Sequence, residues 1–168
     1  MTVLGVISDT HGLLRPEAVA ALRGCVHILH AGDVGSAAVL DELRKIAPVT
    51  VVRGNVDSGA WAQEIPPSEV VEFEGVSIYM LHILAELDLK PEAAGFAAVL
   101  YGHSHKPASE VRNGVLFFNP GSAGKRRFSL PRCCGLLEIS SKEIKGQILS
   151  LEDGEKSLPA EVVLPIKK

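Results

Sequence analysis

Short apolar runs alternate with segments of helical character in the first third of the chain. The apolar runs cover residues 3–7, 26–29 and 49–52, and the helical segments cover residues 16–23 and 36–47. Pro16 and Gly24 are placed to begin and end the first helix, and Ser36 and Pro48 are placed to do the same for the second. This order is typical of parallel strands joined by helices that pack on the sheet.

The second half of the chain has a different pattern, dominated by paired strands. Glu74-Gly75 separates the runs 70–73 and 76–81, and Asn113-Gly114 separates the runs 109–112 and 115–118. Both dipeptides are typical of tight hairpin turns. A short helix after Pro91 and strands at 97–101, 133–139 and 144–151 complete the prediction. Without an internal repeat or a linker, residues 1–168 are expected to form a single α/β domain with mixed sheets.

Composition excludes several classes of protein. With 168 residues, 46% hydrophobic residues and 22% charged residues, the chain has the make-up of a globular protein that can bury one core. A formal charge of -3 argues against a general nucleic-acid binder, so we expect no nucleic-acid partner other than a small nucleotide. The three cysteines form no CxxC pair, and no apolar run reaches the roughly 20 residues of a membrane span. A cytoplasmic setting is the resulting expectation, and the oligomeric state stays open.

Five potential metal ligands directly follow five predicted strands. They are Asp9, Asp33, Asn55, His82 and His103. Ligands of open α/β sheets bind in the crevice outside the carboxyl ends of the strands. A single polar residue at such a place is common, but five in succession indicate a binding site.

Two further histidines lie two residues from members of this set. His11 follows Asp9, and His105 follows His103, and side chains at this spacing point to the same side in extended backbone. Carboxylate, amide and imidazole ligands without thiolates suit Mn²⁺, Fe, Co²⁺, Ni²⁺ or Zn²⁺ better than Ca²⁺. Seven ligands are more than one tetrahedral ion can bind, and they suit two ions that share a carboxylate. Such a pair of ions clamps a phosphate and activates water.

The ordered motifs resemble those of the calcineurin-like metallophosphoesterases. They are D-T-H (9–11), G-D (32–33), G-N (54–55), His82 at a strand end and G-H-S-H (102–105). The motifs N-P-G-S (119–122) and G-N-V-D-S (54–58), with the small size, resemble the compact YfcE-type phosphodiesterases, which are related to the eukaryotic scaffold Vps29. The resemblance implies a four-layer α/β/β/α sandwich of two mixed sheets flanked by helices, forming one metallophosphoesterase domain.

The same resemblance implies a dinuclear metal site, with manganese the first expectation and nickel, cobalt, iron or zinc as alternatives. The first ion would take Asp9, His11, Asp33 and His105, and the second would take Asp33, Asn55, His82 and His103. Asp33 would bridge the ions, and Asp33, Asn55 and His103 would act in catalysis, with His103 placed to position the phosphate or the leaving group. The implied activity is hydrolysis of a small phosphodiester through a hydroxide bridging the two ions.

Two positions depart from the family pattern. Many members have G-N-H-D, whose histidine can protonate the leaving group, and this chain has Val56 there. Loss of a general acid matters least for a good leaving group, which favours activated or cyclic phosphodiesters over unactivated monoesters. Relatives usually have H-G-H where this chain has His82-Ile83-Leu84, so the second metal site is the one expected to be altered.

Other functions stay open at this stage. A catalytically weak scaffold of Vps29 type keeps the same fold, and a phosphomonoesterase keeps the same metal ligands. His30 is interpreted either as a structural histidine or as a hydrogen-bonding partner of the Asp33 loop. Lys125-Arg126-Arg127 either guides an anionic substrate or forms an ordinary solvated loop.

Overall fold

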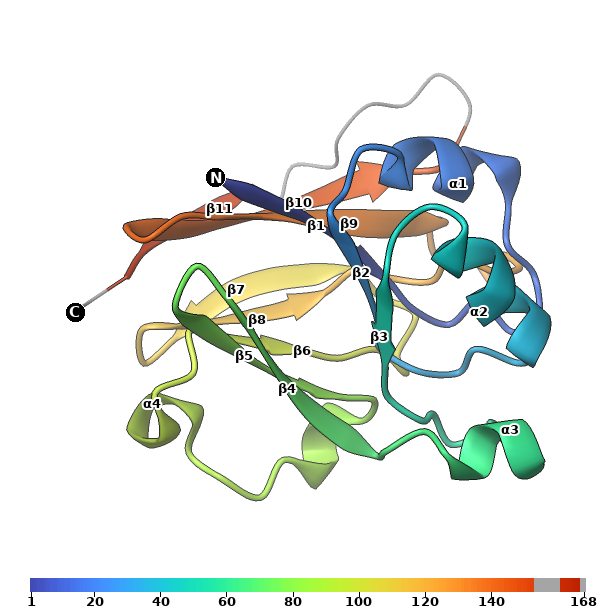
Figure 1. The fold of residues 1–168 in the computed structure, drawn as a ribbon, viewed down its shortest axis with the longest axis horizontal. Coiled ribbons are helices and arrows are strands. Elements are labelled where there is room, and N and C mark those ends of the chain that lie inside the picture. Colours follow the sequence, from blue (N-terminus) through green and yellow to red (C-terminus); the bar gives the residue numbers. More distant parts are fainter. Residues whose placement is uncertain (153–160, 167–168) are drawn as a thin grey trace.

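Two β-sheets packed face to face form the centre of the computed structural model, which describes residues 1–152 and 161–166 (Figure 1). The first sheet has the order β11-β10-β9-β1-β2-β3, formed by β1 (Thr2–Ile7), β2 (His27–His30), β3 (Val49–Val51), β9 (Cys133–Ile139), β10 (Glu143–Ser150) and β11 (Val162–Pro165). The second has the order β4-β5-β6-β8-β7, formed by β4 (Ser68–Phe73), β5 (Val76–Leu81), β6 (Ala98–Leu100), β7 (Ala108–Arg112) and β8 (Val115–Asn119). The helices are α1 (Pro16–Leu22), α2 (Ala37–Arg44), α3 (Ala60–Gln63), the 3₁₀ turn η1 (Leu84–Glu86) and α4 (Pro91–Ala94).

Each sheet contains a parallel unit that brings three strand ends to one edge. In the first sheet β1, β2 and β3 run parallel, as the strand–helix alternation predicts. In the second sheet β5, β6 and β8 run parallel. The loops after these six strands therefore leave the two sheets at their carboxyl ends.

The two predicted hairpins are confirmed, and their turns have the backbone that the sequence requires. β4 pairs with β5 and β7 pairs with β8, both antiparallel. The central residues Glu74-Gly75 have φ of 54° and 75°, and Asn113-Gly114 have φ of 49° and 74°. Positive φ at both central positions matches the right-handed twist of the flanking strands, which is why Asn-Gly is preferred there.

The side chains of β1 alternate between two hydrophobic clusters. Leu4 and Val6 are fully buried between the sheets, whereas Ile7 packs on the other face with Leu22 of α1. Gly5 shares that outer face, and a Cβ there would lie 2.5 Å from Cδ2 of Leu22. The strand period of two thus separates the inter-sheet core from the cluster under α1 and α2.

One aromatic ring occupies a space left by two glycines between the sheets. Phe118 on β8 is fully buried, and a Cβ on Gly135 of β9 would lie 2.5 Å from its ring. A Cβ on Gly146 of β10 would lie 3.0 Å from the same ring. Neither glycine has a positive φ, so both serve close approach of the two sheets rather than a special backbone conformation.

The four-layer α/β/β/α prediction is confirmed, with unequal helical layers. In Figure 1, α1 and α2 cover the outer face of the first sheet, whereas only short elements such as α4 lie beyond the second. On that outer face a separate cluster of Leu81, Val99, Tyr101, Val115 and Phe117 is closed by Leu84 and Leu87. Within the described ranges, no helix is long and apolar enough to cross a membrane.

Several element boundaries differ from the sequence prediction. The second helix was expected over 36–47 but ends at Arg44, because the amides of Lys45 and Ile46 bond to carbonyls three residues back and tighten the last turn. Ser36 occupies the N-cap position, yet its side chain makes no capping hydrogen bond. The short elements α3 and η1 and the edge strand β11 were not predicted, since one turn of helix or four residues of strand leave little periodicity to detect.

Candidate metal centre

The seven sequence-predicted ligands converge at the carboxyl ends of the parallel strands. Asp9, Asp33 and Asn55 follow β1, β2 and β3 of the first sheet. His82 and His103 follow β5 and β6 of the second sheet, and His11 and His105 lie two residues beyond Asp9 and His103. Because both sheets contribute, the site lies across the edge where the two sheets meet.

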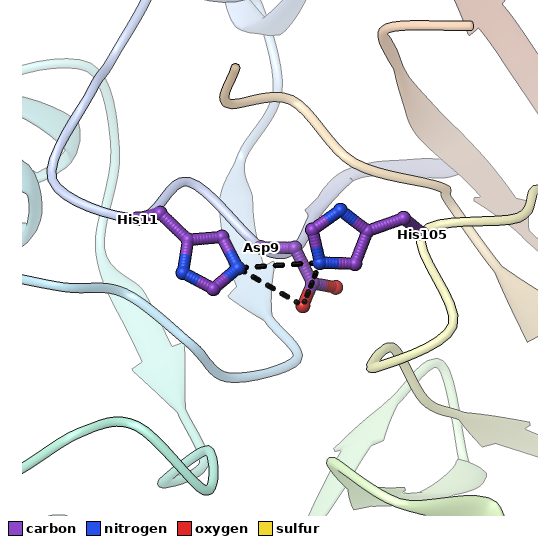
Figure 2. Close-up of side chains that lie close together, drawn as sticks. All are labelled: Asp9, His11 and His105. Atoms are coloured by element: carbon purple, nitrogen blue, oxygen red, sulfur yellow. Dashed lines mark hydrogen bonds and ion pairs between the residues drawn. The ribbon is translucent and has the colours of Figure 1, made fainter. Parts of the chain in front are cut away.

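The first group consists of Asp9, His11 and His105 (Figure 2). Nε2 of His11 lies 3.7 Å from Oδ1 of Asp9, and Nε2 of His105 lies 3.4 Å from the same oxygen. The two Nε2 atoms are 3.2 Å apart. Figure 2 shows the two rings directed toward each other and toward the carboxylate, so three donor atoms face one small volume.

The second group consists of Asp33, His82 and His103, with Asn55 between the two histidines. Nε2 of His82 lies 3.2 Å from Oδ2 of Asp33 and 3.0 Å from Oδ1 of Asn55. Nδ1 of His103 lies 3.0 Å from the same Asn55 oxygen. His82 holds this place although Ile83 follows it, and Leu84 turns away into η1.

One carboxylate oxygen faces both groups. Oδ2 of Asp33 lies 3.2 Å from Nε2 of His82 and 3.7 Å from Nε2 of His11. Asp9 approaches the second group less closely, with its Oδ1 3.9 Å from Nε2 of His82. The two groups are therefore adjacent parts of one polar centre, and Asp33 lies where they meet.

The ligand loops use a backbone conformation that is rare outside glycine. Five of the seven residues have positive φ: 54° at Asp9, 46° at His11, 54° at Asp33, 71° at His103 and 61° at His105. Left-handed backbone at non-glycine residues is disfavoured and persists where the surroundings impose it, typically at functional sites. The folded sheets thus hold these side chains in place at a conformational cost.

Two glycines allow the loops to come this close. A Cβ on Gly54 would lie 2.1 Å from both the amide nitrogen and Oδ1 of Asp33. A Cβ on Gly102 would lie 2.1 Å from Oγ of Ser8 and 2.7 Å from Oδ2 of Asp9. The glycines that precede Asn55 and His103 in the motifs are therefore required for contact between neighbouring loops.

Polar residues that the sequence did not assign a role support the ligand loops. Ser8 donates to Oδ2 of Asp9 at 2.6 Å, and the amide of His103 donates to the same oxygen at 3.1 Å. Asp57 accepts from the amides of Val34, Gly35 and Gly54 and so ties the loops after β2 and β3 together. The position of Asp57, three residues after Gly54, is typical of an aspartate that bonds local backbone, and could have suggested the bond to the Gly54 amide but not those to Val34 and Gly35.

The loop after β8 closes the site from the other side. The side-chain amide of Asn119, through Nδ2, donates to the Gly102 carbonyl at 3.2 Å and to Oγ of Ser104 at 3.1 Å. Oγ of Ser122 donates to the Asp9 carbonyl at 3.0 Å. The N-P-G-S motif therefore holds the loops of both Asp9 and His103.

His30 links two ligand loops, in agreement with the hydrogen-bonding interpretation of this residue. Its Nδ1 accepts from the Gly32 amide at 3.1 Å, and its Nε2 lies 3.0 Å from Oγ1 of Thr10. Thr10 itself donates to the Val34 carbonyl, so Nε2 of His30 is the donor. Burial lowers the pKa of His30 to about 4, which keeps the ring neutral.

The charges of the centre reinforce one another. Burial by itself raises the pKa of Asp9, but the facing imidazoles of His105 and His11 and the hydrogen bond from Ser8 outweigh it and hold that pKa far below its usual value. The pKa of Asp33 is lowered in the same way, because His82 and the bond from the Val56 amide outweigh burial. The carboxylate of Asp9 raises the pKa of His11. Burial lowers the pKa of His82, but the carboxylate of Asp33 outweighs it, so that this pKa is raised. Two carboxylates thus stay ionised and favour cationic groups beside them.

Two observations indicate that this set of donor atoms suits metal ions. Oδ1 of Asp9 is buried and has no hydrogen-bond partner among the described residues, although Nε2 atoms of two histidines face it. Nδ1 of His82 donates to the Ala31 carbonyl at 2.7 Å, which leaves Nε2 facing two oxygens. In the neutral ring this directs a lone pair at two oxygens, an unfavourable contact that a proton or a metal ion at that place would remove.

A cavity of about 400 Å³ opens over the centre. Its lining includes His11, Asp33, Asn55, His103 and His105 from the two groups. The remaining lining residues are Val56, whose surface is 50% exposed, and the consecutive cations Lys125, Arg126 and Arg127. The centre is therefore accessible to a small anionic molecule.

Comparison with known proteins agrees with this geometry. A sequence model of the calcineurin-like phosphoesterase superfamily domain matches residues 1–142. A probable metallophosphoesterase of Methanothermobacter thermautotrophicus is 33% identical over 159 residues, which are 88% of this chain and 91% of that protein. Phosphodiesterase YfcE of Escherichia coli is 28% identical over 162 residues, 82% of this chain and 88% of that protein. The crystal structure of Chaetomium thermophilum Vps29 covers 100% of both chains with a TM-score of 0.80 at 20% identity, a likeness of fold. The chain belongs to the calcineurin-like phosphoesterase superfamily.

Proposed function

We propose that this protein is a phosphodiesterase that depends on two divalent metal ions, with Mn²⁺ as the first candidate, and that residues 1–168 form one metallophosphoesterase domain. The observation that carries the proposal is the position of Asp33. Its Oδ2 lies 3.2 Å from Nε2 of His82 and 3.7 Å from Nε2 of His11, between the two donor groups. A carboxylate so placed can serve two ions at once, as two-metal phosphoesterase chemistry requires.

Each ion would have its own donors besides Asp33. Asp9, His11 and His105 would hold the first ion, and Asn55, His82 and His103 would hold the second. Nitrogen and oxygen donors without sulfur support Mn²⁺ and leave Fe, Co²⁺, Ni²⁺ and Zn²⁺ as alternatives. When bound, a pair of divalent ions clamps a phosphate and lowers the pKa of bound water.

Neighbouring residues of the chain would hold the donor atoms in the orientation that metal binding needs. Ser8 and the His103 amide hold Oδ2 of Asp9, which leaves Oδ1 for the first group. The Ala31 carbonyl holds Nδ1 of His82, so that Nε2 is directed at Asp33 and Asn55. Asn55 and His103 are exposed and line the cavity, where they would position the phosphate or the leaving group.

The cavity lining supports a diester with a good leaving group. Val56 lines the cavity where many family members have a histidine, and its side chain has no proton to give. A leaving group that departs without protonation loses little from this replacement, whereas an alkoxide leaving group loses much. A small activated or cyclic phosphodiester is therefore favoured over an unactivated monoester.

A scaffold function is the alternative, supported by the likeness of fold to Vps29 and by Ile83 and Leu84 standing where relatives usually have H-G-H. The first test is elemental analysis of the purified protein together with hydrolysis of bis-p-nitrophenyl phosphate, with and without added Mn²⁺. The proposal expects two equivalents of metal and metal-dependent release of p-nitrophenol. Absence of turnover with every divalent ion would favour the scaffold, and faster cleavage of p-nitrophenyl phosphate would favour a phosphomonoesterase.

Replacing Asp33 tests the bridging role. Asp33→Ala is expected to lower metal binding and turnover together, by about two orders of magnitude or more, because loss of a residue that merely orients a metal ligand already costs about 10- to 100-fold. Asp41→Ala removes an exposed aspartate of α2 and is the matched control, expected to behave as the wild type. An Asp33→Ala protein with full metal-dependent turnover would overturn the bridging role.

A further inference from the structure

The segment of residues 125–131, here called the basic loop, is anchored at both ends beside the candidate metal centre. A Cβ on Gly124, at its start, would lie 2.5 Å from the Thr10 carbonyl oxygen, so this glycine lies directly against the loop of Asp9. Arg15 donates to the Gly124 carbonyl at 3.1 Å. At its end, Arg132 forms a β-bridge with Ser122. The basic loop therefore leaves and re-enters parts of the chain that also hold Asp9.

Three consecutive cations of the basic loop line the cavity over the centre. Lys125, Arg126 and Arg127 are exposed, and all three belong to the cavity lining together with His11 and Asp33. The amide of Leu130 donates to the Arg127 carbonyl at 3.1 Å, which closes a turn within the loop. The sequence left open whether this run is a substrate guide or a solvated surface, and the fold places it on the wall of the site.

These cations form no ion pair with a carboxylate in the described part of the chain, whereas several other cations do. Arg44 pairs with Asp41, Lys45 with Glu42 and Arg112 with Glu110. Near the basic loop, Glu152 bonds Arg132 through both carboxylate oxygens and attracts Arg126 without forming an ion pair with it. Three adjacent like charges repel one another, and an anion in the cavity would relieve that repulsion.

A simple diester would leave the charge of the basic loop unbalanced. Under the proposed function, two divalent ions, the carboxylates of Asp9 and Asp33 and the attacking hydroxide leave a net charge near +1, which the single negative charge of a diester balances. The three cations of the basic loop on the same cavity wall then face no counter-charge from the diester. Arginine binds phosphate oxygens through paired, charge-assisted hydrogen bonds, so a phosphate dianion is the group that this wall suits.

We propose that the substrate carries a second phosphate group outside the scissile diester, and that Lys125, Arg126 and Arg127 bind it. This inference rests on the proposed function and specifies its substrate class: small phosphodiesters that also carry a phosphomonoester. The scissile diester would lie at the two donor groups, and the second phosphate would lie against the basic loop. The cavity of about 400 Å³ is within the range of sites that hold such small molecules.

A matched pair of substrates tests the proposal. The first is the p-nitrophenyl ester of thymidine 5′-phosphate, and the second is the same compound with an added 3′-phosphate. Both have the same scissile diester, base and leaving group, so the ratio of their kcat/KM values reports only the added phosphate. The wild type with Mn²⁺ is expected to favour the second compound by about tenfold or more, and raising ionic strength is expected to reduce the ratio.

Charge-neutral variants assign the effect to the basic loop. In Arg126→Gln/Arg127→Gln the ratio is expected to fall close to one, and Arg126→Lys/Arg127→Lys is expected to restore part of it. Lys142→Gln is the control, because Lys142 is an exposed cation of the turn after β9, beside the start of β1 and therefore opposite to Asp9. This control is expected to keep the wild-type ratio.

The outcomes separate the two proposals. Equal kcat/KM values for the two compounds in the wild type would overturn the second-phosphate site and leave the phosphodiesterase standing. A preference that persists in Arg126→Gln/Arg127→Gln would overturn the assignment to the basic loop. Failure to cleave either compound or bis-p-nitrophenyl phosphate with any divalent ion would overturn the proposed function itself, and this inference with it.

Discussion

Nε2 of His11 lies 3.2 Å from Nε2 of His105, with the two rings stacked at a centroid distance of 5.1 Å. Oδ1 of Asp9 lies 3.7 Å and 3.4 Å from these nitrogens. One small position is thus close to two imidazole nitrogens and a carboxylate oxygen that has no hydrogen-bond partner within the described residues. Only one of the two imidazoles can donate a proton to the other at this distance, whereas both nitrogens can bind a shared cation.

Removing one of these imidazoles is expected to remove one metal ion. His105→Ala should lower the bound metal from two equivalents to one, because Asp9 and His11 alone leave the first group with a single imidazole. Turnover of bis-p-nitrophenyl phosphate should fall by more than about 100-fold. Losing a residue that only hydrogen-bonds a metal ligand costs up to about 100-fold, and losing the ligand itself should cost more. Elemental analysis and steady-state kinetics on the same preparation measure both effects.

His27→Ala is the matched control for that experiment. His27 lies at the start of β2, away from the strand ends that carry the ligands, and its Nε2 bonds Oγ1 of Thr50 at 2.8 Å. Its metal content and turnover are expected to equal those of the wild type. Two equivalents of metal in His105→Ala would contradict the assignment of the first group.

The buried His30 is expected to make stability depend on pH between about 4 and 6.5. Burial lowers its pKa from 6.5 to about 4, and its Nδ1 accepts from the Gly32 amide, a bond that protonation would break. In this window the unfolded chain binds a proton that the folded chain does not, so the free energy of unfolding rises with pH. The difference over the window is about 3 kcal/mol.

Urea unfolding of metal-free protein from pH 4 to 7.5 measures this dependence. His30→Gln lacks the titrating ring but keeps the other titrating groups, so the difference between the two pH profiles isolates His30. The wild-type profile is expected to be steeper below pH 6.5. Parallel profiles would show that His30 titrates normally in the folded protein.

Phe118 is expected to be a main source of stability. Phe118→Ala removes a fully buried ring that lies against Gly135 and Gly146, and the glycines have no side chains with which to fill the space. The expected loss is about 3–5 kcal/mol, or a drop in Tm of roughly 10 °C. Phe128→Ala is the control: Phe128 is 88% exposed, so its truncation should change the free energy of unfolding by less than about 0.5 kcal/mol. A similar Tm for both variants would contradict the packing described.

The cysteine thiols are expected to be inert in the folded protein. Cys25, Cys133 and Cys134 are buried free thiols, and burial raises the pKa of Cys133 and of Cys134 to about 12. Alkylation requires the thiolate, which is scarce at pH 8 under these conditions. Mass spectrometry after treatment with iodoacetamide should find no adduct in native protein and three in urea. Rapid native labelling at either residue of the Cys133-Cys134 pair would refute this expectation.

The elements predicted correctly are those whose signals are local. The parallel β1-β2-β3 unit follows from alternating apolar runs and helices, and both hairpins follow from their turn dipeptides. The end of α2 was misjudged, because the tightened turn at Lys45 and Ile46 has no sequence signal of its own. The edge strand β11 was missed, since its pairing with β10 depends on tertiary contact.

For the candidate site, residue type and position after a strand were enough to predict which side chains come together. The sequence could not predict that Asp57 collects three amides from two loops, or that Gly102 must lie against Ser8. Both relations depend on the distance between loops, which only the packed sheets determine. For the same reason the interpretation of Lys125, Arg126 and Arg127 had to stay open until the fold placed them on the cavity wall.

The glycine pair under Phe118 has a consequence for how such a centre could be tuned. Phe118 precedes Asn119, and the ring therefore acts as a spacer at the point where the second sheet delivers its histidines opposite the carboxylates of the first sheet. Within each donor group, the distance between the carboxylate of the first sheet and the histidines of the second then depends on the thickness of the core. A side chain at Gly135 or Gly146 would press on the Phe118 ring and change that distance, although neither position belongs to the metal centre.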